Sequence, residues 1–185
     1  MQATSVSVGR TTAQWRVLTR DLTALFGYSA ALAAAAGVIK TPVGVPGHSA
    51  VFWVPVLVLA ASHRRAGMAV ASAALGGFVA HLFGGLHTTE AAAVLAAAGV
   101  LEGTRAATGG RSQGLAMLLG GMLAHLGKLG VKILAAVCGG GPLNAAGLAL
   151  LPTLAFYAAF GLIGGALAWG VWSAWAGLRR YHGHK

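Results

Sequence analysis

Long apolar stretches alternate with short polar or basic segments along the chain. The apolar runs cover residues 22–39, 51–61, 66–86, 91–101, 114–138 and 148–175. An α-helix needs about 20 mostly apolar residues to cross the ~30 Å hydrocarbon core of a bilayer. The first, third, fifth and sixth runs have about that length, whereas the second and fourth are shorter. The pattern predicts an all-α integral membrane protein, a bundle of six transmembrane helices.

The predicted organisation has three parts. Residues 1–21 form a polar N-terminal segment, residues 22–178 form the membrane domain, and residues 179–185 form a basic tail. With their flanks, the predicted helices span residues 22–40, 49–62, 66–86, 88–103, 113–138 and 148–176. The second and fourth helices could either cross fully or be shorter helices buried against their neighbours.

Composition excludes several classes of protein. Of the 185 residues, 57% are hydrophobic and only 9% are charged, against roughly 25% charged in a typical soluble domain. An ordinary soluble enzyme and a disordered chain are therefore both excluded. The chain holds 13 Lys and Arg but 3 Asp and Glu, a net charge of +10. A nucleic-acid partner is not predicted, because these bases fall between apolar runs and do not cluster on a soluble fold.

The position of the bases predicts the orientation, because cytoplasmic loops carry an excess of Lys and Arg. With six spans, one side receives both termini and the segments near residues 63–65 and 102–111. Ten bases fall there: Arg10, Arg16, Arg20, Arg64, Arg65, Arg105, Arg111, Arg179, Arg180 and Lys185. The sequence therefore predicts a multi-pass protein of the cell membrane with a cytoplasmic N-terminus and C-terminus.

Small residues are abundant, with 29 glycines in the chain. Helices in lipid associate through close backbone approach at such residues. In the first helix, the pairs Ala30/Ala34 and Ala31/Ala35 form a narrow ridge at spacing i, i+4. Either packing inside the bundle or docking of another membrane subunit would explain this ridge.

Ionisable residues at membrane depth are costly, so each one is a functional hypothesis. Spacings of three and four place His125, Lys128 and Lys132 on one face of the fifth helix. The same outer half of the bundle receives a further group of polar residues: His81, His87, Glu90, Lys40, His48 and Asn144. Glu90 could act as a structural partner of one lysine, and Lys132 could extend to the headgroups.

The chemistry of this group favours a small anionic or zwitterionic solute. Lysines would pair with its charge and histidines would donate hydrogen bonds. A metal site is not predicted, because neighbouring lysines repel divalent cations and metal-ligand spacings are missing. The sequence contains no nucleotide-binding P-loop and no paired catalytic groups, so neither a cofactor nor an enzymatic activity is predicted.

The segment between the first two predicted helices, residues 40–50, has two prolines and two glycines, which favour a shaped turn. It could cap an outward-facing cavity or be a simple connection. Trp53 follows it and could stack on a flat ligand or anchor the helix at the membrane interface.

In size, six-helix layout and alanine-rich first helix, residues 20–178 resemble the substrate-binding S-components of energy-coupling factor (ECF) vitamin transporters. The resemblance implies that the faces Ala30/Ala34 and Ala31/Ala35 dock a transmembrane T-component. It also implies an outward-facing pocket closed by residues 40–50, and energy supplied by separate ATPase subunits. A chain beginning Met1-Gln2 departs from the metal-specific branch, which begins Met-His.

The expected function is thus the membrane-embedded solute-binding subunit of an ECF-type importer. The alternative is a non-transport structural or assembly subunit of a membrane complex. A transition-metal importer subunit and a membrane enzyme are further alternatives that the residues favour less.

Overall fold

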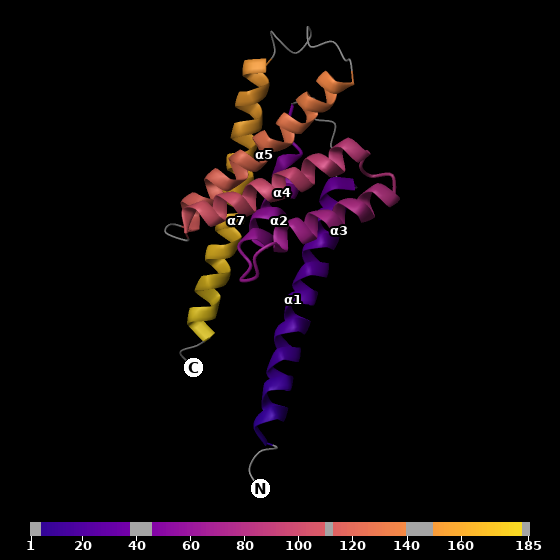
Figure 1. Cartoon of the computed structure of the whole chain (residues 1–185). Helices are drawn as coiled ribbons and strands as arrows, with labels where there is room; N and C mark the ends of the chain where they lie inside the picture. Colours follow the sequence, from indigo (N-terminus) through magenta and orange to yellow (C-terminus); the bar gives the residue numbers. More distant parts are fainter. Residues whose placement is uncertain (1–4, 38–45, 110–112, 140–149, 183–185) are drawn as a thin grey trace.

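The computed structural model describes residues 5–37, 46–109, 113–139 and 150–182, which form six α-helices and no strand (Figure 1). The helices are α1 (Ser5–Gly37), α2 (Ala50–Ala61), α3 (Met68–Leu82), α4 (Thr88–Thr108), α5 (Gln113–Cys138) and α7 (Leu150–His182). The all-helical class predicted from the apolar runs is confirmed.

Two of these helices, α5 and α7, are long and apolar enough to cross a membrane by length and composition. α2 and α3 are also apolar but contain only 12 and 15 residues. By this measure, α5 and α7 are candidate membrane spans. The arrangement of six full spans stays a prediction.

The two terminal helices are longer than predicted. α1 begins at Ser5, so most of the polar segment 1–21 is helical, and α7 continues beyond residue 176 to His182. Counting apolar residues missed these extensions because Arg, Gln and Leu favour a helix without being buried. Figure 1 shows the N-terminus of α1 and the C-terminus of α7 at the same end of the molecule.

The short helix α2 occupies the centre of the fold and packs against all five other described helices. Seven of its 12 residues are buried, including Trp53, Val54, Leu57 and Val58. Because neighbouring helices and not lipid surround it, α2 does not need the length of a membrane span. This arrangement matches the alternative of a short buried helix.

Two side chains of α4 hold the ends of α2 and α3. Glu102 Oε1 accepts a hydrogen bond from the backbone N–H of Ala69, in the first turn of α3, at 3.0 Å. Arg105 donates to the carbonyl of Ala61, the last residue of α2. Each charge has the sign that a helix end favours, and each satisfies a backbone group that the helix itself leaves unpaired.

Glycines let α5 and α7 cross in close contact. A Cβ added at Gly121 would lie 2.5 Å from the carbonyl oxygen of Gly161, and one at Gly165 would lie 2.5 Å from that of Met117. Only hydrogen fits between these backbones, as at small-residue crossings in membranes. The crossing fixes the relative position of the side chains above and below it on both helices.

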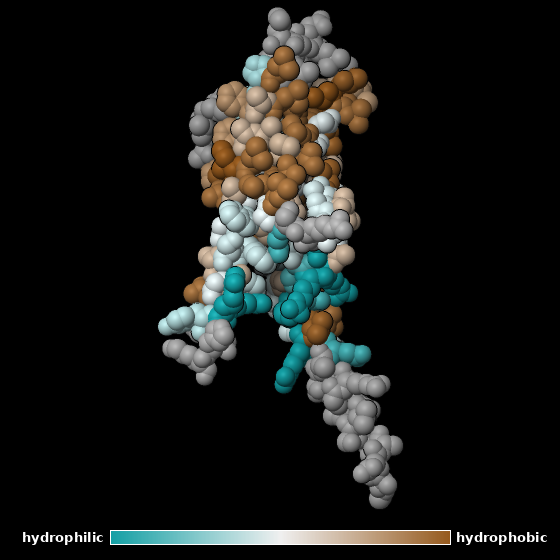
Figure 2. All heavy atoms as spheres, turned by 90° about the vertical axis from the view of Figure 1, so that its left-hand side faces the viewer, coloured by the Kyte–Doolittle hydropathy of each residue, from teal (hydrophilic) through white to brown (hydrophobic). Residues whose placement is uncertain are grey.

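The outer surface divides into an apolar and a polar part. Figure 2 shows a broad hydrophobic surface over the upper part of the molecule and hydrophilic side chains gathered at the lower end. Many large apolar side chains of α5 and α7 are exposed: Leu115, Leu123, Leu134, Leu151, Phe156, Ile163, Leu167 and Val171. An apolar patch this extensive is unusual on a soluble monomer and typical of a surface that contacts lipid.

Candidate functional site

The inward face of α5 carries the two most deeply buried basic groups of the described structure. His125 is 1% exposed and Lys128 is 6% exposed, whereas the side chain of Lys132, one turn further on, is 38% exposed. The spacing of three between the first two residues places both toward the core. The predicted three-residue face therefore turns from the interior toward the surface along its length.

Aromatic rings enclose His125 on two sides. The ring of Tyr157 from α7 stacks on it with centroids 4.2 Å apart and an interplanar angle of 12°. The ring of Trp53 from α2 lies tilted at 5.3 Å. Trp53, His125, Lys128 and Tyr157, here called the lysine cluster, thus join three helices at one buried point.

A backbone hydrogen bond fixes the imidazole of His125. Its Nε2 lies 3.0 Å from the carbonyl oxygen of Gly47, just before α2. A carbonyl only accepts, so Nε2 carries the proton, and in the neutral ring Nδ1 is an acceptor. Nδ1 is buried without a hydrogen-bond partner among the described residues. The histidine therefore offers the cluster an acceptor, and its donor is already used.

Lys128 supplies a buried positive charge. Its Nζ lies 4.7 Å from the centre of the Trp53 ring, a cation–π contact. The carboxylates that form ion pairs in the described structure, Asp21 and Glu90, pair with other residues. The indole N–H of Trp53 is also buried without a partner there. The cluster therefore contains a cation and an N–H donor that no described acceptor satisfies.

Glu90 pairs with the outer lysine. Its Oε1 lies 3.5 Å from Lys132 Nζ, and both side chains are partly exposed. Glu90 also lies in the first turn of α4, where a negative charge is favourable. Glu90 is thus the structural partner of Lys132, and it forms no ion pair with Lys128 in the described structure.

The other predicted site residues lie outside the cluster. His81 is exposed, and its Nδ1 is 2.9 Å from the carbonyl of Leu86, within the turn after α3. His87 is exposed just before α4, and His48 is half-buried in the turn before α2. Lys40 and Asn144 lie outside the described residues. In the predicted lid, residues 40–50, the described part from residue 46 contributes the carbonyl of Gly47.

Sequence reasoning missed Gly47 and Tyr157. Gly47 adopts φ +83°, and a Cβ there would lie 2.9 Å from His125 Nε2 and 3.0 Å from Tyr157 Cδ2. A left-handed glycine beside a histidine is thus required for the closed packing. Tyr157 could have been noticed from the sequence, because it lies inside an apolar run and a buried tyrosine hydroxyl usually needs a hydrogen-bond partner.

The alanine ridge of α1 is mostly on the surface. Ala30, Ala31 and Ala34 are exposed, whereas Ala35 is buried in the core. Gly27, one turn earlier, has nothing within 4 Å of an added Cβ. Both members of the pair Ala30/Ala34 are thus exposed, and the pair Ala31/Ala35 is divided between surface and core.

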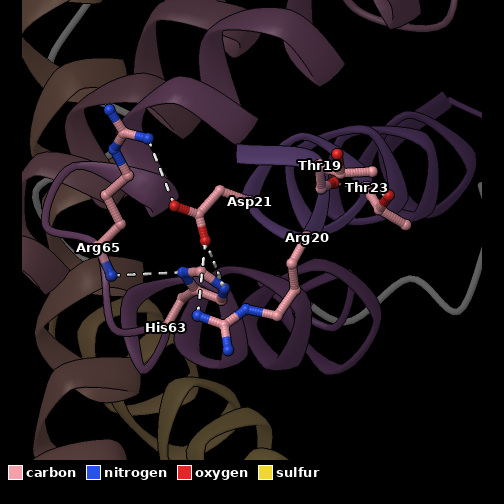
Figure 3. A network of polar contacts seen from close by, with 6 residues as sticks. All are labelled: Thr19, Arg20, Asp21, Thr23, His63 and Arg65. Carbon is pink, nitrogen blue, oxygen red and sulfur yellow. Dashed lines mark hydrogen bonds and ion pairs between the residues drawn. The ribbon is translucent and has the colours of Figure 1, made fainter. Parts of the chain in front are cut away.

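The opposite end of the molecule holds the exposed bases and a buried carboxylate. Asp21 of α1 points toward the turn between α2 and α3, where Arg65 Nη1 lies 3.3 Å and His63 Nε2 3.8 Å away (Figure 3). Arg20 Nη2 is 3.9 Å from the same carboxylate. This network fastens α1 to the α2–α3 turn.

The groups of the lysine cluster can pair with an anion, donate one N–H and accept one hydrogen bond. Within the described residues, no group of three or more His, Cys, Asp or Glu could hold a metal ion. No family model, curated protein or solved structure matches the chain.

Proposed function

We propose that the chain is a membrane-embedded solute-binding subunit of an ECF-type importer, and that the lysine cluster holds the solute. One observation carries the proposal: Lys128 is buried and has no carboxylate partner among the described residues, and it lies beside two polar groups that also lack a partner there. Burying such a charge costs several kcal/mol unless an opposite charge compensates it. A bound acid would supply that compensation.

The cluster also limits the chemistry of the solute. An acidic group would meet Lys128 Nζ and the indole N–H of Trp53, and an O–H or N–H of the solute would meet Nδ1 of His125. The aromatic rings favour a flat or apolar body. A small, vitamin-like acid or zwitterion fits these requirements.

Access to the cluster requires movement, because Trp53 and His125 are each 1% exposed. The segment at Gly47 is the candidate lid, since its carbonyl bonds to His125 and its glycine packs on Tyr157. Capture from the outside would occur with this segment displaced. Release would then depend on partner subunits, for which the exposed pair Ala30/Ala34 is the proposed T-component contact.

The test is mass spectrometry of small molecules released on denaturing the purified protein. Wild-type protein should release one acid or zwitterion in a near-stoichiometric amount. Lys128→Met, which keeps the shape but not the charge, should lower the affinity for that compound roughly 10- to 100-fold, because hydrogen bonds to charged groups contribute ~1.5–3 kcal/mol.

Lys132→Met is the matched comparison on the same helix. Because Lys132 is partly exposed and already paired with Glu90, its loss should lower the affinity by no more than about fivefold. Equal retention by wild type and Lys128→Met would contradict the site.

Partner subunits are tested separately, by purification from native membranes. A pair of ATPases and a further membrane subunit should accompany the wild-type chain. Co-purification with a respiratory or biosynthetic complex, without ATPases, would support the structural-subunit alternative instead.

A further inference from the structure

A second candidate site lies at the end of the bundle opposite the lysine cluster. A cavity of about 860 Å³ is bounded by Arg20, Arg64, Arg105 and Arg179, together with His63. We call the cavity bounded by these four arginines the arginine cavity. Its α5 wall is formed by residues in the first turns of the helix, including Met117, well before His125 and Lys128. The two sites are therefore separate.

The arginine cavity has a strongly positive lining. No Asp or Glu lies among its lining residues. Arg20 approaches Asp21 at a distance of 3.9 Å, which is a weak pairing, and Arg64 forms no ion pair within the described residues. Arg105 uses one N–H on the carbonyl of Ala61, which leaves other N–H donors of its guanidinium available. The lining therefore places several guanidinium donors around one cavity.

The walls between the arginines are mainly apolar. Tyr28 of α1, Val58 of α2, Leu101 of α4 and Trp172 of α7 all contribute. The Cζ atom of Arg179 lies over the Trp175 ring, 3.4 Å from its centre, which is a cation–π contact at the wall of the cavity. A ligand that fills the cavity must combine a negative charge with an apolar body.

The shape of the cavity favours an approach from the side. α1 and α7 line two of its walls, yet no substantial packing joins the described parts of these two helices. Val171 and Trp175 belong both to the lining and to the exposed surface of α7, a helix long enough to cross a membrane. The apolar wall is therefore continuous with the surface expected to contact lipid.

We propose that the arginine cavity binds an anionic phospholipid that enters between α1 and α7. The phosphate would lie among the arginines, whose planar guanidinium groups pair well with phosphate oxygens. An acyl chain would lie along the apolar wall. A soluble phosphate ester has the same head chemistry but leaves that wall unoccupied. This proposal does not rest on the solute site.

Native mass spectrometry of the full-length protein in detergent tests it with three probes. These are phosphatidylglycerol, phosphatidylcholine with the same chains, and glycerol 3-phosphate, which lacks chains. Wild-type protein should bind the first molecule of phosphatidylglycerol at least about tenfold more tightly than phosphatidylcholine. Glycerol 3-phosphate should show no binding at the same concentration.

Neighbouring arginines provide a matched control. Arg64→Gln combined with Arg179→Gln should abolish the preference for phosphatidylglycerol, whereas Arg180→Gln, next to the cavity residue but outside the lining, should preserve it. Ala116→Phe adds bulk to the wall without changing charge, and should weaken both lipids equally.

Four results would overturn the proposal. The first is that wild-type protein binds the two lipids equally, and the second is that Arg180→Gln loses the preference for phosphatidylglycerol as fully as the double variant. The third is that glycerol 3-phosphate binds as tightly as phosphatidylglycerol. The fourth is that Ala116→Phe binds both lipids as tightly as wild type. The third result would assign the cavity to a soluble phosphate ester.

Discussion

The lysine cluster and the arginine cavity both present positive charge, but they differ in burial. Lys128 is 6% exposed and its Nζ lies over the Trp53 ring, whereas the side chain of Arg20 is 57% exposed at the edge of an open cavity. A buried charge without a partner destabilises the fold, but a solvated charge costs little. We therefore expect the proposed solute to be fully enclosed by the cluster, and the proposed lipid to remain partly outside the cavity.

The crossing of α5 and α7 separates the two regions, so the largest effect is expected there. In Gly121→Ala, the new methyl group would meet the Gly161 carbonyl at 2.5 Å, and both are backbone positions that cannot turn aside. Overpacking of this kind costs about 1–3 kcal/mol. For a chain of this size the Tm should fall by roughly 2–12 °C in detergent.

Gly130→Ala on the same helix is the control, because nothing lies within 4 Å of its added Cβ. Its Tm should be unchanged or slightly higher. Similar losses in both variants would mean that the crossing is not as close as described.

The next prediction compares the stability change on removing a buried positive charge with that on removing an exposed one. Lys128→Met should raise the stability of the solute-free protein by about 1–3 kcal/mol, because it replaces an unpartnered buried charge with an apolar side chain of similar length. Arg64→Gln, at the exposed edge of the arginine cavity, should change it by less than about 0.5 kcal/mol. Thermal unfolding in detergent measures both, and a loss of stability in Lys128→Met would contradict the buried unpaired state.

The connection between Gly47 and His125 can be tested by a smaller change. Gly47→Ala should destabilise the protein by about 1–2 kcal/mol more than Gly84→Ala. Both glycines have positive φ, but only Gly47 would bring a Cβ against His125 and Tyr157. Equal Tm values for the two variants would show that Gly47 is not closely packed against His125 and Tyr157.

The smallest effect concerns the fastening of α1 beside the arginine cavity. Asp21→Asn removes the charge that holds Arg65 and the α2–α3 turn, and should cost about 1 kcal/mol. Thr19→Ala is the control on the same helix, since the Thr19 hydroxyl bonds only to the carbonyl of Trp15 at 2.8 Å. Its Tm should shift by much less, and a comparable shift would contradict the role of the Asp21 network.

The sequence predicted the positions of the helices better than it predicted the contacts between them. Six apolar runs became six described helices, and the spacing of His125 and Lys128 predicted their shared face. The helical part of the segment before residue 22 was missed, because a solvated helix has no apolar run to reveal it. Tyr157 was missed because it lies within an apolar run whose inward face depends on the partner helix.

The arginine cavity illustrates the same limit. Arg20, Arg64, Arg105 and Arg179 belong to four separate segments, and the sequence explained them by orientation alone. Their common position around one cavity follows from how α1, the α2–α3 turn, α4 and α7 converge. The same arginines thus support both the predicted orientation and the proposed lipid site.

By itself the sequence determined the helical class, the apolar surface and the unequal charge, because these follow from local periodicity and composition. Only the tertiary structure decided which charges are buried. Burial depends on contacts between residues far apart in the chain, such as Gly47 with His125, and local pattern contains no information about them. Burial is what distinguishes Lys128 from the arginines. The buried charge of Lys128 needs an opposite charge nearby, whereas solvent stabilises the exposed arginines without one.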